Sequence, residues 1–149
     1  MNTSPPEPSD SPDRHAIVAG YGPVGRAVTA GLEAAGVEVT VLELNEATVK
    51  TQAELGRSIV HGDATVADDL RRANLERAQA LILAIPDEQS AVRACEVARE
   101  VAPEVFISAR TNFVSQGLEA SRLGADHVTI EEIATAEHMR NAVLDRLDH

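Results

Sequence analysis

The chain has 149 residues, a formal net charge of −11 and no run of lysine or arginine, which excludes nucleic acids and anionic membrane surfaces as partners. Hydrophobic residues make up 44 % of the chain and aromatic residues only 2 %, so Ala, Val, Leu and Ile must build the core. No apolar run approaches the ~20 residues that span a bilayer, and no basic segment followed by an apolar run indicates a secretory signal. The single cysteine, Cys95, excludes a disulfide framework and is expected to be a small buried hydrophobic residue. We therefore expect a cytoplasmic protein that does not insert into a membrane.

The composition divides the chain into two regions. Residues 1–14 are rich in proline, serine and acidic residues, and are predicted to form a disordered tail because they cannot bury a core. Residues 15–149 alternate short apolar runs with amphipathic helical patterns and are predicted to form one domain. The predicted strands are residues 15–19, 38–44, 58–61, 80–85, 105–109 and 126–130.

Helical patterns with capping residues separate these strands. Asn45 and Asp87 are expected to cap two helices, Thr65 with Asp68 three residues later is expected to open a short one, and Asn112 is expected to cap another. The predicted helices are residues 23–35, 46–55, a short helix after residue 65, 88–101, one that ends at Gly124, and 131–147.

The alternation of strands and helices predicts the fold. Six strands joined by right-handed crossovers through helices predict an α/β, Rossmann-like, doubly wound six-stranded parallel sheet in a single domain, with strand order 3-2-1-4-5-6. The continuous apolar run 80–85 is typical of a strand that helices cover on both faces.

A Gly-x-Gly-x-x-Gly motif joins the first strand to the first helix. Gly20 suits the tight turn, Gly22 suits close approach of the backbone to a pyrophosphate, and Gly25 suits close packing of helix on strand. Pro23 suits the first helical turn. The free amides and the positive end of the helix dipole would face the phosphates, so the motif predicts a dinucleotide-binding loop.

An acidic residue follows at the spacing that this fingerprint requires. Glu43 lies at the end of the second strand, 18 residues after Gly25, and is expected to bind both hydroxyls of an adenosine ribose. Its charge would repel a 2′-phosphate, which disfavours NADP. Asp63, after the third strand, either meets the adenine or ribose end of the ligand or only shapes its own turn. The neighbouring His61 is interpreted as structural.

The fourth and fifth strands are expected to complete the crevice. Ala84 and Ile85 would form its floor, and Arg110, directly after the fifth strand, is expected to bind phosphate oxygens; the alternative is a plain surface arginine. No catalytic residue and no metal site is predicted, because the histidines are scattered and no nucleophile–base pair is apparent. About twenty residues follow the sixth strand, which are too few for the substrate domain of a dehydrogenase.

Taken together, five motifs in register resemble the TrkA N-terminal domain family, also called the RCK or KTN domain. Within that family the chain is most similar to the domain attached to glutathione-gated Kef potassium efflux systems. The motifs are Gly20–Gly25, Val41-Leu42-Glu43-Leu44-Asn45, His61-Gly62-Asp63-Ala64-Thr65, Ile107-Ser108-Ala109-Arg110 and Leu123-Gly124-Ala125-Asp126-His127-Val128.

This resemblance implies a regulatory module that binds NAD(H) or an adenine nucleotide (AMP, ADP or ATP) without chemistry on the ligand, and is therefore not an enzyme. It implies a homodimer or higher ring and a membrane potassium channel or transporter as partner, with the ligand state coupled to the arrangement of the domains. The last helix carries an apolar stripe and resembles the helix that crosses to a partner subunit; the alternative is a helix packed on its own sheet. The stripe consists of Ile133, Ala136, Met139, Val143 and Leu147.

The chain also departs from the family pattern. The family more often has Asp where Glu43 stands, and Arg110 and Asn112 occupy the positions of the acidic pair that binds calcium in calcium-gated relatives. An NAD-dependent oxidoreductase whose substrate site comes from a partner is the alternative function. The predicted cofactor-binding residues are Gly20, Tyr21, Gly22, Pro23, Val24, Gly25, Glu43, Asn45, Asp63, Ala64, Ala84, Ile85 and Arg110.

Overall fold

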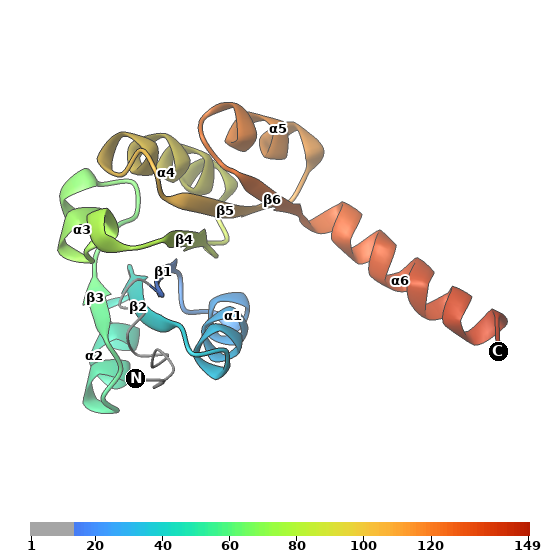
Figure 1. Ribbon diagram of the computed structural model, residues 1–149, viewed down its shortest axis with the longest axis horizontal. Coiled ribbons are helices and arrows are strands. Elements are labelled where there is room, and N and C mark those ends of the chain that lie inside the picture. Colours follow the sequence, from blue (N-terminus) through green and yellow to red (C-terminus); the bar gives the residue numbers. More distant parts are fainter. Residues whose placement is uncertain (1–13) are drawn as a thin grey trace, which may run out of the picture.

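The computed structural model describes residues 14–149, so residues 1–13 of the predicted tail lie outside the described residues. One sheet of six parallel strands has the order β3-β2-β1-β4-β5-β6, which confirms the predicted fold and strand order (Figure 1). The strands are β1 (His15–Ala19), β2 (Glu38–Glu43), β3 (Ile59–His61), β4 (Ala80–Leu83), β5 (Phe106–Thr111) and β6 (His127–Ile130). The helices are α1 (Pro23–Ala34), α2 (Glu46–Glu54), α3 (Ala67–Arg72), α4 (Glu88–Val101), α5 (Val114–Arg122) and α6 (Glu131–Leu147), with a short 3-10 turn, η2 (Leu75–Arg77).

Helices cover the two faces of the sheet unequally. Helices α3, α4 and α5 lie on one face, and α1 and α2 lie on the other, over β1, β2 and β3 (Figure 1). The larger core lies under α3–α5 and includes Ile17, Leu81 and Ile107, all fully buried, together with Cys95, as expected. The smaller core under α1 includes Val18 and Val41.

Within residues 14–149, no helix covers the half of the sheet formed by β5 and β6 on the α1 side (Figure 1). Along β5 the buried residues Ile107 and Ala109 alternate with half-exposed Phe106 and partly exposed Ser108. On β6, His127 pairs with Ser108 in the register and is exposed. This strip of strand surface therefore remains open to solvent in the single chain.

Helix α6 leaves the body of the domain and projects away from the sheet (Figure 1). Every residue of α6 except Glu131 is exposed, including Met139 and Leu147, which are 64 % and 73 % exposed. The apolar stripe predicted for this helix is therefore present and is not packed on the helix's own sheet. Among residues 14–149, none of the helices is long and apolar enough to cross a membrane.

The capping of the helices agrees with the prediction in part. The side chain of Asn45 caps α2 by accepting a hydrogen bond from the amide of Thr48 at 3.0 Å. Asp87 occupies the N-cap position of α4, but its carboxylate accepts from the Ser90 hydroxyl at 2.6 Å rather than from an amide. Thr65 does not open α3, which begins at Ala67, because its amide and hydroxyl both donate to the Asp63 carboxylate.

The predicted cap of α5 by Asn112 is wrong for a different reason. This helix begins at Val114, and carboxylates from other helices hold the amides at its start. Glu88 of α4 accepts from the amides of Asn112 and Phe113, at 2.7 and 3.1 Å, and Glu132 of α6 accepts from the amide of Val114 at 3.3 Å. These long-range acceptors replace the local side-chain cap.

Candidate nucleotide-binding site

The three glycines of the loop between β1 and α1 meet different structural requirements. Gly20 has φ +99°, which only glycine adopts readily, and its amide donates to the carbonyl of Leu42 at 2.9 Å. Gly25 packs against that turn so closely that a Cβ there would lie 1.8 Å from the Gly20 carbonyl oxygen. Gly22 has an ordinary φ of −82° and open space around it. Neither conformation nor packing within residues 14–149 requires a glycine at position 22, and the predicted close approach of a ligand there stays a prediction.

The N-terminus of α1 is suited to an anion. Pro23 occupies the first helical position, as predicted, and the first turn contains no acidic residue. Among the hydrogen bonds of residues 14–149, none uses the amides of Gly22, Val24 or Gly25. These amides add to the positive end of the helix dipole, so the loop offers donors for phosphate oxygens.

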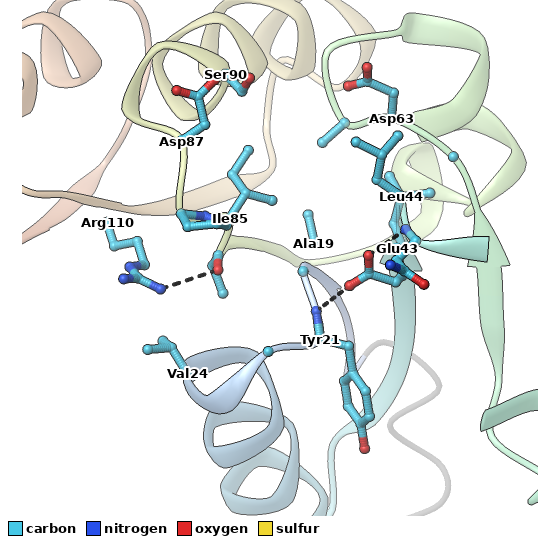
Figure 2. A pocket seen from close by; sticks show the side chains of 18 of the residues that line it. Ala19, Tyr21, Val24, Glu43, Leu44, Asp63, Ile85, Asp87, Ser90 and Arg110 are labelled. Atoms are coloured by element: carbon cyan, nitrogen blue, oxygen red, sulfur yellow. Dashed lines mark hydrogen bonds between the residues drawn. The ribbon is translucent and has the colours of Figure 1, made fainter. Parts of the chain in front are cut away.

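Glu43, at the carboxyl end of β2, lies beside this loop. Its carboxylate accepts from the amide of Tyr21 at 2.8 Å and from the amide of Asn45 at 2.6 Å (Figure 2 shows the first of these bonds). A carboxylate has about four lone-pair positions, so two remain for the hydroxyls of a ribose. Glu43 thus also holds the glycine loop against β2, a role that the sequence analysis did not include.

Tyr21 contributes its backbone to the cleft, whereas its ring points away from it (Figure 2). The ring is 9 % exposed, and the guanidinium groups of Arg26 and Arg57 stack over it at 4.7 and 5.2 Å from its centre. Arg57 also pairs with Glu33 at 3.1 Å, and this hydrogen bond raises the pKa of Arg57. The contacts of Tyr21 with Arg26 and Arg57 therefore hold the glycine loop on the side that faces away from the cleft.

Asp63 follows β3 and lies farther from the glycine loop than Glu43 does (Figure 2). One of its carboxylate oxygens accepts from both the amide and the hydroxyl of Thr65, at 2.8 and 2.7 Å. Its own amide donates to Asp69 at 2.9 Å, and this bond, followed by the ion pair with Arg72, lowers the pKa of Asp69. Asp63 therefore shapes its own turn and also lines the cleft, and its contact with the adenine or ribose end of a ligand stays a prediction.

Arg110 lies within β5 and not after it, because the strand runs on to Thr111. Its side chain is directed to the carboxyl edge, where it donates to the carbonyl of Ala84 at 3.5 Å and pairs with the carboxylate of Glu131 (Figure 2 shows the bond to Ala84). Ala84 and Ile85 follow β4 between Arg110 and the glycine loop. Arg110 is the only basic residue among the described residues that line the cleft.

These groups surround one cleft of about 900 Å³, comparable to the ~300–1,000 Å³ of small-molecule sites. The structure brings together every predicted site residue except Gly25, which is buried beneath the loop. The lining residues that the sequence analysis missed are Ala19, Leu42, Leu44, Gly62, Pro86, Asp87 and Ser90. Leu44 directly follows β2, and Pro86 and Asp87 lie in the segment after β4, so a position just beyond a strand was the available signal for these three.

A family model places this architecture among known proteins. The model for the TrkA-N domain matches residues 16–131, which include the glycine loop, Glu43 and Arg110. The chain belongs to the TrkA-N domain family. The match ends at the first residue of α6, so most of that projecting helix lies beyond the matched part of this TrkA-N domain.

Among the curated proteins, this TrkA-N domain is similar to the glutathione-regulated potassium-efflux system protein KefC of Cronobacter sakazakii. The two are 28 % identical over 93 % of this chain and 22 % of the relative. The KefC protein of an Escherichia coli strain is 30 % identical over 78 % of this chain and 19 % of its own length. The chain thus spans about a fifth of these relatives.

Three solved structures share the fold along most of this chain. The TrkA-N domain of the inner membrane protein ybaL of Escherichia coli has a TM-score of 0.83 and 30 % identity, covering 87 % of this chain and 96 % of that one. The Kef CTD of Shewanella denitrificans in its AMP-bound form has a TM-score of 0.76 and 27 % identity over 91 % and 82 %. The GsuK channel bound to NAD has a TM-score of 0.77 and 25 % identity over 90 % and 24 %.

Proposed function

We propose that this TrkA-N domain is a nucleotide-binding regulatory domain of a potassium channel or transporter, with NAD(H) or an adenine nucleotide as ligand. The observation that carries the proposal is the cleft in which a phosphate-binding loop, Glu43 and Arg110 meet at one edge of the sheet. Relatives named as potassium-efflux proteins and neighbours bound to AMP or NAD support it. Such a ligand is available in the cytoplasm, where we place the domain.

Each side of the cleft has a defined role in this proposal. The amides of the glycine loop receive phosphate oxygens, and the guanidinium of Arg110 binds them from the opposite side. Glu43 accepts hydrogen bonds from the ribose hydroxyls and disfavours a 2′-phosphate by repulsion. The adenine lies toward Asp63, with Leu44 and Ile85 as apolar surface.

Ligand binding is tested by thermal unfolding and calorimetry with NAD, NADH, AMP, ADP, ATP and NADP. A ligand at one hundred times its Kd stabilises the native state by about 2.7 kcal/mol, so a binding nucleotide raises the melting temperature. Glu43→Ala and Arg110→Ala are expected to weaken binding about tenfold or more, because each removes a charged hydrogen-bond partner. Arg93→Ala, an exposed arginine on α4 outside the cleft, is the control. Binding of none of these nucleotides would refute the proposal.

We further propose that the domain forms a homodimer through α6. An apolar stripe on an exposed helix and an open strip of β5 and β6 are two surfaces of one chain that a second copy would cover. Sedimentation velocity is expected to show a dimer that Met139→Gln with Val143→Gln converts to monomer. The control, His138→Gln with Asn141→Gln, changes the opposite side of the helix and is expected to remain dimeric. A wild-type monomer at all concentrations would contradict this arrangement.

Binding without turnover is the third part of the proposal. In the alternative, an oxidoreductase, a partner would supply the substrate site above the nicotinamide. The two differ in a direct assay: a regulatory domain leaves the absorbance of the reduced nicotinamide unchanged with a panel of substrates, whereas an oxidoreductase changes it.

A further inference from the structure

Arg110 touches both the cleft and the start of the projecting helix. Its guanidinium lines the cleft and bonds to the Ala84 carbonyl, while the same group pairs with the carboxylate of Glu131. Glu131 is the first residue of α6, and its side chain is 39 % exposed against 21 % for that of Arg110. One side chain therefore connects the wall of the candidate binding site to α6.

The guanidinium also lies next to the glycine loop. The Ala84 carbonyl oxygen that accepts from Arg110 is the atom nearest to a Cβ built on Gly20, at 3.0 Å. Arg110 and the first glycine of the loop thus flank the same carbonyl group (Figure 2 shows Arg110 opposite the loop). A phosphate seated on the loop amides comes within reach of this guanidinium.

We propose that Glu131 competes with the ligand phosphate for Arg110, so that occupation of the cleft releases the start of α6. Carboxylate and phosphate both bind the fork of a guanidinium in the same bidentate way, and the two anions repel each other when they share it. The inference rests on the nucleotide binding proposed above and names its regulation. Glu131 acts through Arg110 and does not touch the ligand.

Few hydrogen bonds and ion pairs hold the start of α6 to the domain, so replacing Glu131 by a ligand phosphate at Arg110 would loosen the helix. Besides the pair of Glu131 with Arg110, the amide of Glu132 donates to the Asn112 carbonyl at 3.3 Å, and the Glu132 carboxylate accepts from the Val114 amide at 3.3 Å. All later residues of the helix are exposed. Loss of the Arg110 pair removes one of these ties, and by linkage any position of α6 that separates Glu131 from Arg110 raises affinity for a phosphate-bearing ligand.

The first test is calorimetry with two probes, ADP and adenosine, which differ by the phosphates. Glu131→Gln is expected to tighten ADP binding about threefold, because it removes the charged competitor of a partly exposed pair, and to leave adenosine binding unchanged. Glu137→Gln, which removes the same charge at an exposed position further along α6, is the matched control and is expected to leave both unchanged. In the Arg110→Gln background, Glu131→Gln is expected to have no effect.

The outcomes separate this inference from the proposed function. If the wild type binds ADP and Glu131→Gln leaves its affinity unchanged or weakens it, the competition does not exist, although the nucleotide site stands. An equal gain with Glu137→Gln would reduce the effect to general charge and overturn the inference as well. If the wild type binds neither ADP nor adenosine, this inference is overturned, and the proposed function is rejected as well only when the other nucleotides named above also fail to bind.

The second test measures the helix itself. Because Cys95 is the only cysteine and is fully buried, labels attach selectively to cysteines introduced at exposed positions of α6 and α2, the latter at Lys50. The α6 label is placed at exposed Asn141 and not at Met139, because Met139 belongs to the apolar stripe of the proposed dimer contact. Distances between spin labels at Asn141 and Lys50 are expected to change with saturating ADP and to remain unchanged with saturating adenosine, and Arg110→Gln is expected to abolish the change. An unchanged distribution with ADP bound would overturn the release of α6.

Discussion

The substitution Gly25→Ala tests the packing on which the whole site depends. An alanine Cβ at this position would lie 1.8 Å from the Gly20 carbonyl oxygen and 2.8 Å from its carbonyl carbon. Both opposing atoms belong to the backbone, so α1 and the loop must move apart, because no side chain can repack to relieve the contact. Overpacking of a core costs ~1–3 kcal/mol, and we expect the upper end of that range here.

A cost of about 3 kcal/mol corresponds to a fall in melting temperature of about 6–12 °C for a domain of this size. Thermal unfolding followed by circular dichroism measures it. Gly22→Ala is the matched control, because φ of −82° suits alanine and no atom lies within 4 Å of the added Cβ. We expect Gly22→Ala to melt within about 2 °C of the wild type, as surface changes away from special features usually do.

The two variants differ again in ligand binding. The methyl group of Gly22→Ala stands on the loop that lines the cleft, so we expect it to weaken ADP binding about tenfold without unfolding the protein. A Gly25→Ala protein that melts like the wild type would refute the packing argument. A Gly22→Ala protein that binds ADP normally would refute close approach of the phosphate as the reason for glycine there.

Three further predictions concern Glu43, Asp126 and Cys95. Glu43→Gln is expected to lower stability by about 1 kcal/mol, because its amide nitrogen can no longer accept from one of two backbone amides, and to reduce the preference for NAD over NADP in calorimetry. The pKa of Asp126 lies below its usual range, first because its carboxylate accepts from the Ile107 amide and then because of Arg99. Because the native pKa is lowered, the ionised Asp126 adds to the free energy of unfolding at pH values above its unfolded pKa of about 3.9. This contribution is lost as the pH falls through the native pKa. The urea midpoints of wild type and Asp126→Asn are therefore expected to differ at pH 7 and to converge below about pH 4; equal midpoints at pH 7 would contradict this. Burial raises the pKa of Cys95 to about 11, so a thiol reagent at pH 8 is expected to react only after unfolding; rapid reaction of the native protein would contradict it.

Those parts of the fold that depend on local chemistry were predictable from sequence. Apolar runs and right-handed crossovers place Glu43 and the glycine loop at one edge of the sheet, and the structure confirms that placement. The N-cap at Asn45 was also predicted correctly, because the capping side chain bonds to an amide only three residues later in the chain. Thr65 failed as a cap because its amide and hydroxyl donate to Asp63, two residues earlier, whereas at Asn112 the competing acceptor is Glu88, 24 residues away; capping propensity includes neither competitor.

The same limit applies to the candidate site. Its lining follows from the strand ends, which is why nearly every predicted residue faces the cleft. The pairing of Arg110 with Glu131 joins residues 21 positions apart on different elements, and no local pattern indicates it. A charged residue at a strand end can thus be located from sequence, whereas its partner requires the fold.

Helices α4 and α6 show what an amphipathic pattern does and does not determine. Both have apolar residues at helical spacing, yet Ala91, Ala94 and Ala98 of α4 are fully buried while Met139 and Val143 of α6 are exposed. The periodicity indicates that one face of the helix requires an apolar partner surface. Only the fold shows whether the same chain supplies that surface. In α4 the sheet supplies it. Helix α6 projects away from its own sheet (Figure 1), which therefore cannot supply that surface, and another copy of the chain or another protein is the place to look for it.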